Sequence, residues 1–111
     1  MSDFKRYTVE FLKVIADSTR LEILNFLKGT EKSSSDIQEE LDRSQSTISK
    51  HLNMLVDNNL IAFEKKDNIK YYKIRNADIL NLINRINSVV LDINKEKLKD
   101  IQDVDIRETL S

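Results

Sequence analysis

The sequence has 111 residues, 40% of them hydrophobic and 33% charged, with a formal net charge of -1. This length suits one domain, here expected over residues 1–111, and leaves no room for a second core. The chain has no cysteine, which excludes disulfides and thiolate metal sites. Its apolar runs are too short and too interrupted by charge for a signal peptide or a membrane span, so we expect a cytoplasmic protein with no membrane partner.

Two helices are predicted in the first quarter of the chain. Residues 3–16 place aromatic residues on one side at helical spacing, namely Phe4, Tyr7 and Phe11. Asp17 and Ser18 then offer an N-cap for a helix that is apolar over most of its circumference, so this second helix should be central to the core. Gly29 follows its last turn and is expected to adopt the left-handed conformation that ends a helix.

A helix-turn-helix is predicted over about residues 35–58. One of Ser33, Ser34 and Ser35 caps a short helix that buries Ile37 and Leu41, and residues 43–44 form the turn. In the second helix the apolar residues Ile48, Leu52, Leu55 and Val56 recur at intervals of three and four. That spacing produces one stripe directed toward a core.

The opposite side of this second helix carries short polar side chains. Ser46, Ser49, Lys50 and Asn53 form a second stripe, and Gln45 extends it by one turn. Hydroxyls, an amide and a cation suit a surface that approaches base edges and phosphates without steric bulk. The alternative is an ordinary solvated helix face, because Ser, Gln and Lys are common surface residues.

Two further features favour DNA recognition over a solvated face. Ser44, Ser46, Thr47 and Ser49 crowd the first turns, although Ser and Thr are mediocre helix formers. In addition, no acidic residue occurs between Asp42 and Asp57, although acids are 19 of the 111 residues. A surface directed at phosphates needs this absence of carboxylates, so we interpret the segment as a recognition helix.

A β-hairpin is predicted over about residues 60–75, where the apolar period changes to two. Ile61 and Phe63 alternate with polar positions, a turn follows, and Tyr72 and Ile74 alternate in the same way. Basic residues occupy the tip and the outer face, so we interpret this two-stranded hairpin as a wing that contacts DNA beside the helix. The alternative is a charged surface turn.

A last helix is predicted over about residues 77–98, capped by Asn76 or Asp78. Its apolar stripe is wider than a helix closing a small domain needs. We expect it to form a homodimer with the aromatic first helix, the alternative being that the stripe packs internally. The predicted dimer interface consists of Phe4, Tyr7, Phe11, Ile79, Leu82, Ile83, Ile86, Val89, Val90 and Ile93.

The charge distribution supports a DNA-facing third of the chain. From Arg43 to Arg75 there are seven cations and three acids, a balance of 7 − 3 = +4, whereas the remainder carries 11 − 16 = −5. A continuous basic segment within an acidic chain is typical of a local nucleic-acid surface rather than of general coating.

These segments resemble the ArsR/SmtB (arsenic-repressor) family of winged-helix transcriptional repressors. The resemblance covers about residues 9–80: I-A-D-S-T-R-L-E-I-L-N-F-L from Ile15, then the helix-turn-helix, then K-Y-Y-K-I. Its most specific part is S-Q-S-T-I-S-K-H-L, residues 44–52. The family implies a homodimer that binds a palindromic operator and releases it when an effector, often a metal ion, binds. Two departures are tolerable: Ser18 replaces a common Pro, and Asp67-Asn68 replaces a Gly at the wing tip.

The metal sites implied by the family are missing from this sequence. Ser33 and Ser35 occupy the positions of its Cys-x-Cys thiolates, and hydroxyls do not replace thiolates for soft metals. In the other site type, Leu80 and Leu91 stand at the imidazole positions. His51 is the only histidine, and we expect it to contact phosphate or to pack. We therefore expect no metal site and no cofactor, with an effector that is lost, replaced or non-metal.

The sequence thus predicts a mainly α protein with a β-hairpin (α+β), a winged helix-turn-helix with terminal dimerisation helices. Its predicted function is that of a dimeric, sequence-specific transcriptional regulator, a repressor at the nucleoid that binds inverted-repeat DNA. The alternative is a winged-helix module that binds protein. An enzyme is disfavoured because His51 has no nucleophile and acid around it in any recognisable motif. The predicted DNA-binding residues are Arg43, Ser44, Gln45, Ser46, Thr47, Ser49, Lys50, His51, Lys65, Lys66, Asn68 and Lys70.

Overall fold

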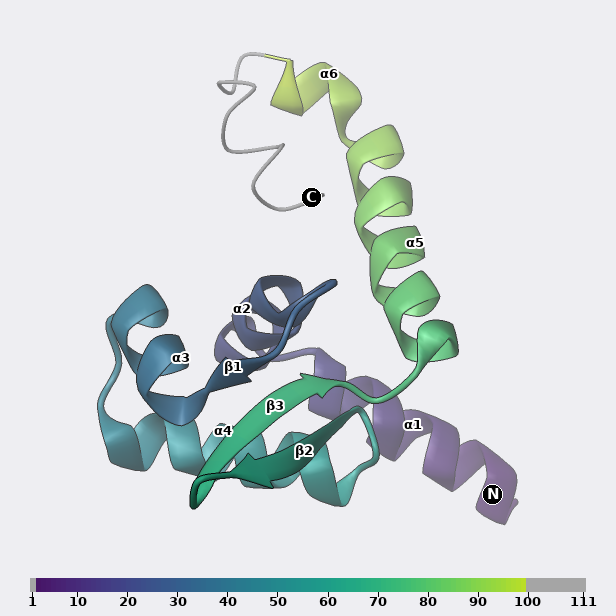
Figure 1. The fold of residues 1–111 in the computed structure, drawn as a ribbon. Coiled ribbons are helices and arrows are strands. Elements are labelled where there is room, and N and C mark those ends of the chain that lie inside the picture. The colour runs from purple at the N-terminus through teal and green to yellow at the C-terminus, as the bar shows by residue number, and fades with distance from the viewer. Residues whose placement is uncertain (1, 100–111) are drawn as a thin grey trace.

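The computed structural model describes residues 2–99 (Figure 1). The elements are α1 (Asp3–Ile15), α2 (Ser18–Leu27), β1 (Lys32–Ser33), α3 (Ser34–Leu41), α4 (Gln45–Asp57), β2 (Ile61–Lys66), β3 (Ile69–Ile74), α5 (Ala77–Ile93) and α6 (Lys95–Leu98). Helices form most of the fold, and the β2–β3 hairpin follows the α3–α4 helix-turn-helix directly. The predicted fold class, a winged helix-turn-helix, is confirmed.

Side-chain caps start the helices that position the site. The Asp17 carboxylate accepts the Arg20 amide at the start of α2. Ser33 caps α3 in a capping box, because its hydroxyl accepts the Asp36 amide while the Asp36 carboxylate accepts the Ser33 amide. Asn76, one of the two predicted candidates, caps α5. Gly29 follows Lys28, the C-cap of α2, and has a φ of 70°, the left-handed conformation predicted for it.

The sheet has one more strand than the sequence predicts. Its order is β1-β3-β2, so the short strand β1 pairs antiparallel with β3 and places Lys32 opposite Tyr72. A two-residue strand is too short to show a period of two, which is why the pattern predicts only a hairpin. β1 therefore connects the wing to the start of α3.

The tip of the hairpin is a two-residue turn. Lys66 pairs with Ile69, and between them Asp67 and Asn68 have φ values of 54° and 64°. Two consecutive positive φ angles define a type I′ turn, which matches the twist of the flanking strands. Asp and Asn tolerate this conformation better than most non-glycine residues, so the wing closes without the glycine.

The core lies among the end of α1, α2, α3, α4, the sheet and the first half of α5. Of the four residues of α4 predicted to face it, Ile48, Leu52 and Leu55 are at most 1% exposed. The fourth, Val56, is partly buried and packs against the core. The remaining core residues are Val14, Ile15, Ile23, Leu24, Leu27, Ile37, Leu41, Leu60, Ile61, Tyr72 and Ile83. Because one side of α4 is anchored in this core, its opposite side has a fixed orientation.

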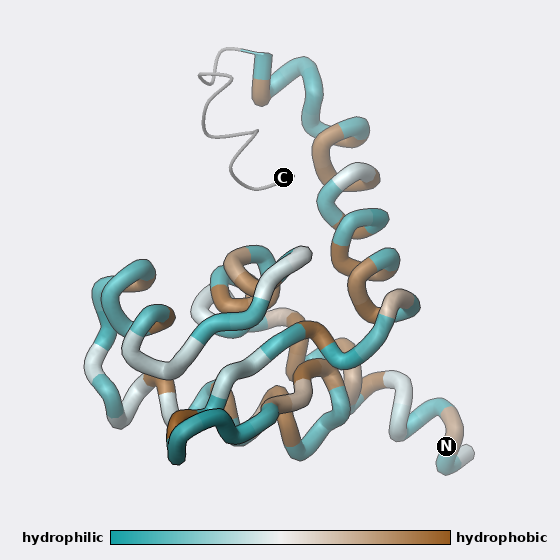
Figure 2. Tube along the Cα trace, in the orientation of Figure 1, coloured by the Kyte–Doolittle hydropathy of each residue, from teal (hydrophilic) through white to brown (hydrophobic). Residues whose placement is uncertain are grey.

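Helix α5 extends away from the rest of the fold (Figure 1), and hydrophobic segments recur along it (Figure 2). The predicted helix over residues 77–98 is in fact two helices, because α5 ends at Ile93 and the Asn94 side chain bonds back to the Val90 carbonyl. Ile83 is 1% exposed and belongs to the core of its own chain. Phe11, Ile79, Leu82 and Ile86 pack partly against that core.

The outer parts of α1 and α5 expose large apolar side chains. Phe4 is 81% exposed, Tyr7 60% and Ile93 75%. Val89 and Val90 are also exposed. A soluble chain seldom leaves so many large apolar groups in water along two helices.

Candidate nucleic-acid interface

The first turn of α4 is built from hydroxyl groups. Ser44 is the N-cap, and its hydroxyl oxygen accepts the Thr47 amide at 3.2 Å. The same oxygen lies 2.9 Å from the Thr47 hydroxyl and 3.2 Å from the Ser46 hydroxyl. Ser44 and Thr47 are therefore occupied in starting the helix, which holds the neighbouring side chains in place.

Gln45, Ser46 and Lys50 are exposed, and Ser49 is half-buried beside them. Ser46 and Lys50 lie on the side of α4 opposite to the buried residues. Gln45 and Ser49 lie on the flank between these two sides. The first turn of α4 contains no acidic residue, so the partial positive charge of the helix N-terminus is not offset there. This face is polar, free of local carboxylates and suited to a polyanion.

The lysines of the wing lie on its two faces. Lys65 pairs directly with Lys70, and the Lys70 ammonium nitrogen is 4.4 Å from the centroid of the Phe63 ring. Phe63 pairs in turn with the buried Tyr72. Since opposite residues share a face, Lys65 and Lys70 lie on the face that packs against the helices.

Lys66 lies on the other face of the wing. Its ammonium donates a hydrogen bond to the Glu31 carboxylate and lies 5.6 Å from the centroid of the Tyr71 ring. This hydrogen bond lowers the pKa of Glu31 and raises the pKa of Lys66. The sequence does not reveal this pair, because Glu31 and Lys66 are 35 positions apart.

Arg43 and His51 occupy different environments. Arg43 is exposed in the turn before α4, where it donates to the Leu41 carbonyl at 3.3 Å. The His51 side chain is 14% exposed, and its Nδ1 lies 3.2 Å from an Arg20 guanidinium nitrogen and 3.8 Å from the Asp17 carboxylate. Of the two roles expected for His51, this geometry corresponds to packing.

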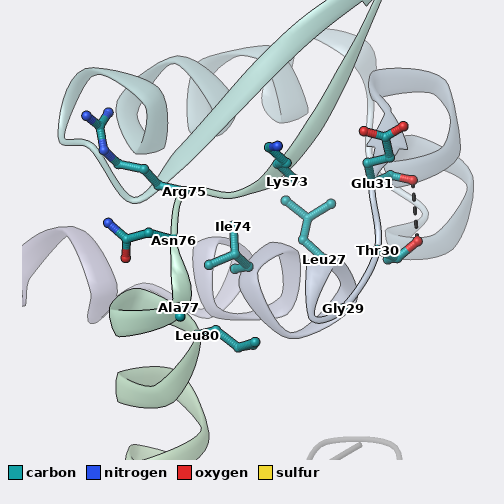
Figure 3. Close-up of a pocket in the computed structure, with 10 residues that line it drawn as sticks. All are labelled: Leu27, Gly29, Thr30, Glu31, Lys73, Ile74, Arg75, Asn76, Ala77 and Leu80. Atoms are coloured by element: carbon teal, nitrogen blue, oxygen red, sulfur yellow. Dashed lines mark hydrogen bonds between the residues drawn. The ribbon is translucent and has the colours of Figure 1, made fainter.

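A groove of about 520 Å³ lies where α2, β3 and α5 meet (Figure 3). Leu27, Ile74 and Leu80 form its apolar part, while Glu31, Lys73 and Arg75 supply charge. None of the residues that line it belongs to α4. The groove is therefore separate from the polar face of the recognition helix.

Within residues 2–99, the structure brings together no group of three or more His, Cys, Asp or Glu side chains that could hold a metal ion. Helices long and apolar enough to cross a membrane are also absent from that range.

The fold and the polar face of α4 define a winged-helix DNA-binding regulator of transcription. A family model described as "Bacterial regulatory protein, arsR family" matches residues 17–62. The arsenical resistance operon repressor of Staphylococcus aureus is 37% identical over 78 residues, which cover 70% of this chain and 75% of that protein. The transcriptional repressor SdpR of Bacillus subtilis (strain 168) is 36% identical, covering 65% of this chain and 80% of that protein. The chain belongs to the arsR family.

Solved structures share the fold. The transcriptional regulator HlyU of Vibrio vulnificus CMCP6 has a TM-score of 0.68 and 29% identity, covering 77% of this chain and 88% of that chain. Rv0081 of M. tuberculosis has a TM-score of 0.82 at 21% identity, covering 88% of this chain and 99% of that chain. At this identity the likeness supports the fold alone. The resemblance inferred from the sequence is confirmed.

Proposed function

We propose that this chain is a homodimeric repressor that binds an inverted-repeat operator in the cytoplasm, at the nucleoid. The observation that carries this function is that α4 is fixed in the core on one side, while its exposed residues before Asp57 are polar and include no acid. The alternative, a module that binds protein, would need exposed aromatic or leucine side chains on that face. Gln45, Ser46, Ser49 and Lys50 stand there instead.

The interface divides into residues that read bases and residues that contact phosphates. Gln45, Ser46 and Ser49 lie on the first turns of α4, the part of a recognition helix that enters the major groove. Phosphate contacts are assigned to Arg43 and Lys50 and to three lysines of the wing, Lys65, Lys66 and Lys70. Asn68, in the turn at the wing tip, is assigned to the same DNA-facing surface. Ser44 and Thr47 act through the helix cap, and His51 acts through packing.

The dimer uses the exposed apolar residues of α1 and α5. Phe4, Tyr7, Val89, Val90 and Ile93 form the proposed contact surface, because they are exposed in a single chain. Phe11, Ile79, Leu82 and Ile86 lie at its inner edge. A two-fold axis between two such chains imposes an inverted repeat on the DNA, with half-sites about one helical turn apart.

The signal that releases DNA is proposed not to be a transition metal. Ser33, which replaces a family thiolate, is used in the capping box of α3. Leu80 and Leu91 stand where the family's imidazoles would be, and their side chains cannot ligate a cation. We also propose that the chain regulates without catalysing a reaction.

Selection of bound fragments from random DNA tests this function. We expect enrichment of an inverted repeat, and a sedimentation mass of two chains. Gln45→Ala should cost about 1–3 kcal/mol on the selected site and little on random DNA. Lys70→Ala should weaken binding to both DNAs alike and reduce the salt slope by about one for each phosphate that the lysine neutralises. Failure to enrich any sequence, or equal losses for Gln45→Ala on both DNAs, would refute the proposal.

A further inference from the structure

Arg20 occupies the junction of three helices. It lies in the first turn of α2, and its amide is bound by the Asp17 cap at 3.0 Å. Its guanidinium donates through Nε to the Val14 carbonyl and through Nη2 to the Lys13 carbonyl at 3.3 Å. Its Nη1 faces Nδ1 of His51 at 3.2 Å. One side chain thus joins the end of α1, the start of α2 and the middle of α4.

The contacts to α1 satisfy groups that the helix cannot satisfy itself. Lys13 and Val14 lie in the last turn of α1, where backbone carbonyls lack partners within the helix. The planar guanidinium has several donors in a fixed fork, so it can bind these carbonyls and the imidazole at the same time. A lysine ammonium has no such planar fork.

The contact to α4 lies next to the reading face. His51 follows Lys50 directly and is two positions from Ser49, yet its ring is directed toward α2. Because the guanidinium of Arg20 can only donate, this contact is a hydrogen bond in the tautomer of His51 whose Nδ1 accepts. The Asp17 carboxylate, 3.8 Å from Nδ1, is the other charged group at this ring.

We propose that Arg20 is a positioning residue that sets the orientation of the recognition helix relative to the dimerisation helix α1, through His51. In a dimer, α1 is fixed to the partner and α4 to the DNA, so Arg20 controls the separation of the two recognition helices. That separation determines which operator spacing fits. This inference rests on the proposed dimer and DNA binding.

The test uses the absence of cysteine from the sequence. Asp57→Cys, at the exposed end of α4, provides a single attachment site for a spin label, and the distance between two labels in the dimer reports the separation of the recognition helices. We expect a narrow distribution for the otherwise unchanged chain and a broader or shifted one for Arg20→Lys. Without the label, Arg20→Lys should lose at least tenfold affinity for the selected operator and less than twofold for random DNA.

Three variants serve as controls. His51→Gln keeps a side-chain oxygen that can accept from Arg20 and should retain both the narrow distribution and operator affinity, whereas His51→Leu should behave like Arg20→Lys. Arg85→Lys makes the same exchange at an exposed position of α5. It should change neither the distance distribution nor the operator affinity. Thermal unfolding of each variant separates loss of positioning from loss of fold.

The outcomes are distinguishable. If the parent dimer gives its narrow distribution and Arg20→Lys matches it in distance and in operator affinity, Arg20 does not position α4. An equal loss on operator and random DNA, or a loss that only follows a lower unfolding temperature, also overturns the inference. If the labelled parent gives no measurable distance between two labels, or selects no DNA sequence, the proposed dimeric DNA-binding function is refuted, and this inference is refuted with it.

Discussion

Glu31→Gln is expected to strengthen DNA binding, although residue 31 lies outside the helix-turn-helix and the wing. In the free protein the Glu31 carboxylate holds the ammonium of Lys66 in an ion pair on the outer face of the wing. A DNA phosphate must displace this carboxylate before it can use Lys66. The neutral amide keeps the shape of the side chain but removes the competing charge.

The size of this effect depends on the number of counterions that the protein releases from the DNA when its lysines bind phosphates. Each phosphate contact changes the slope of log K against log salt by about 0.9. Two protomers should therefore steepen it by up to about 1.8, the value for a parent complex in which Glu31 keeps Lys66 paired. A fourfold rise in salt, from about 50 to about 200 mM, should then shrink the advantage of the variant roughly tenfold. Both partners are substantially exposed, with side-chain accessibilities of 39% for Glu31 and 51% for Lys66, so folding stability should change little.

Fluorescence anisotropy on the selected operator and on a random duplex, at four or more salt concentrations, measures this effect. Glu96→Gln is the matched control, because Glu96 also forms an ion pair, with Lys99, but lies on α6. It should leave the slope unchanged. If Glu31→Gln has the parent slope and affinity, or if Glu96→Gln has the same effect, Glu31 does not compete with DNA phosphate for Lys66.

Three other predictions address the dimer, the effector and the start of α2. Val90→Asp places a charge at a position that is 50% exposed in one chain and should yield a folded monomer by sedimentation and circular dichroism; a dimer of normal affinity would contradict the proposed surface. Zinc should leave operator affinity unchanged in an anisotropy titration, and release at one ion per chain would show a metal response. Asp17→Ala should destabilise by about 1 kcal/mol at neutral pH. The hydrogen bond from the Arg20 amide lowers the pKa of Asp17 below 3.8, so this stabilisation is present above that pH and lost as the pH falls through the lowered pKa. In denaturation curves the difference between parent and variant should therefore shrink below about pH 4, and a constant difference would refute this role.

The sequence was most informative where a local pattern decides the structure. The three- and four-residue spacing of Ile48, Leu52 and Leu55 is enough to predict which side of α4 is buried. The change of period after Asn59 is enough to predict the hairpin, because alternation is the direct consequence of strand geometry. Asp17 and Asn76 are recognisable caps because short polar side chains satisfy free amides at helix starts.

Contacts between distant segments could not be predicted in this way. Lys66 was expected to be a free phosphate ligand, but its partner Glu31 is brought near by the pairing of β1 with β3. His51 follows the polar stripe in sequence, yet Arg20, 31 positions earlier, holds its ring. Ile83 belongs to the predicted dimer stripe, but its side chain lies in the core of its own chain. Each of these depends on tertiary packing, which periodicity does not encode.

The proposed dimer contact through the exposed apolar residues of α1 and α5 has a consequence for how such a regulator responds to its own abundance. When DNA binding requires two chains and the chain concentration lies below the dimer dissociation constant, mass action makes the dimer concentration vary with the square of the chain concentration. Halving the number of chains then lowers the dimer roughly fourfold. In the dimer that we propose, the apolar surface that includes Phe4 and Ile93, 81% and 75% exposed in one chain, would thereby make the occupancy of an operator a steep function of gene dosage, without any small molecule.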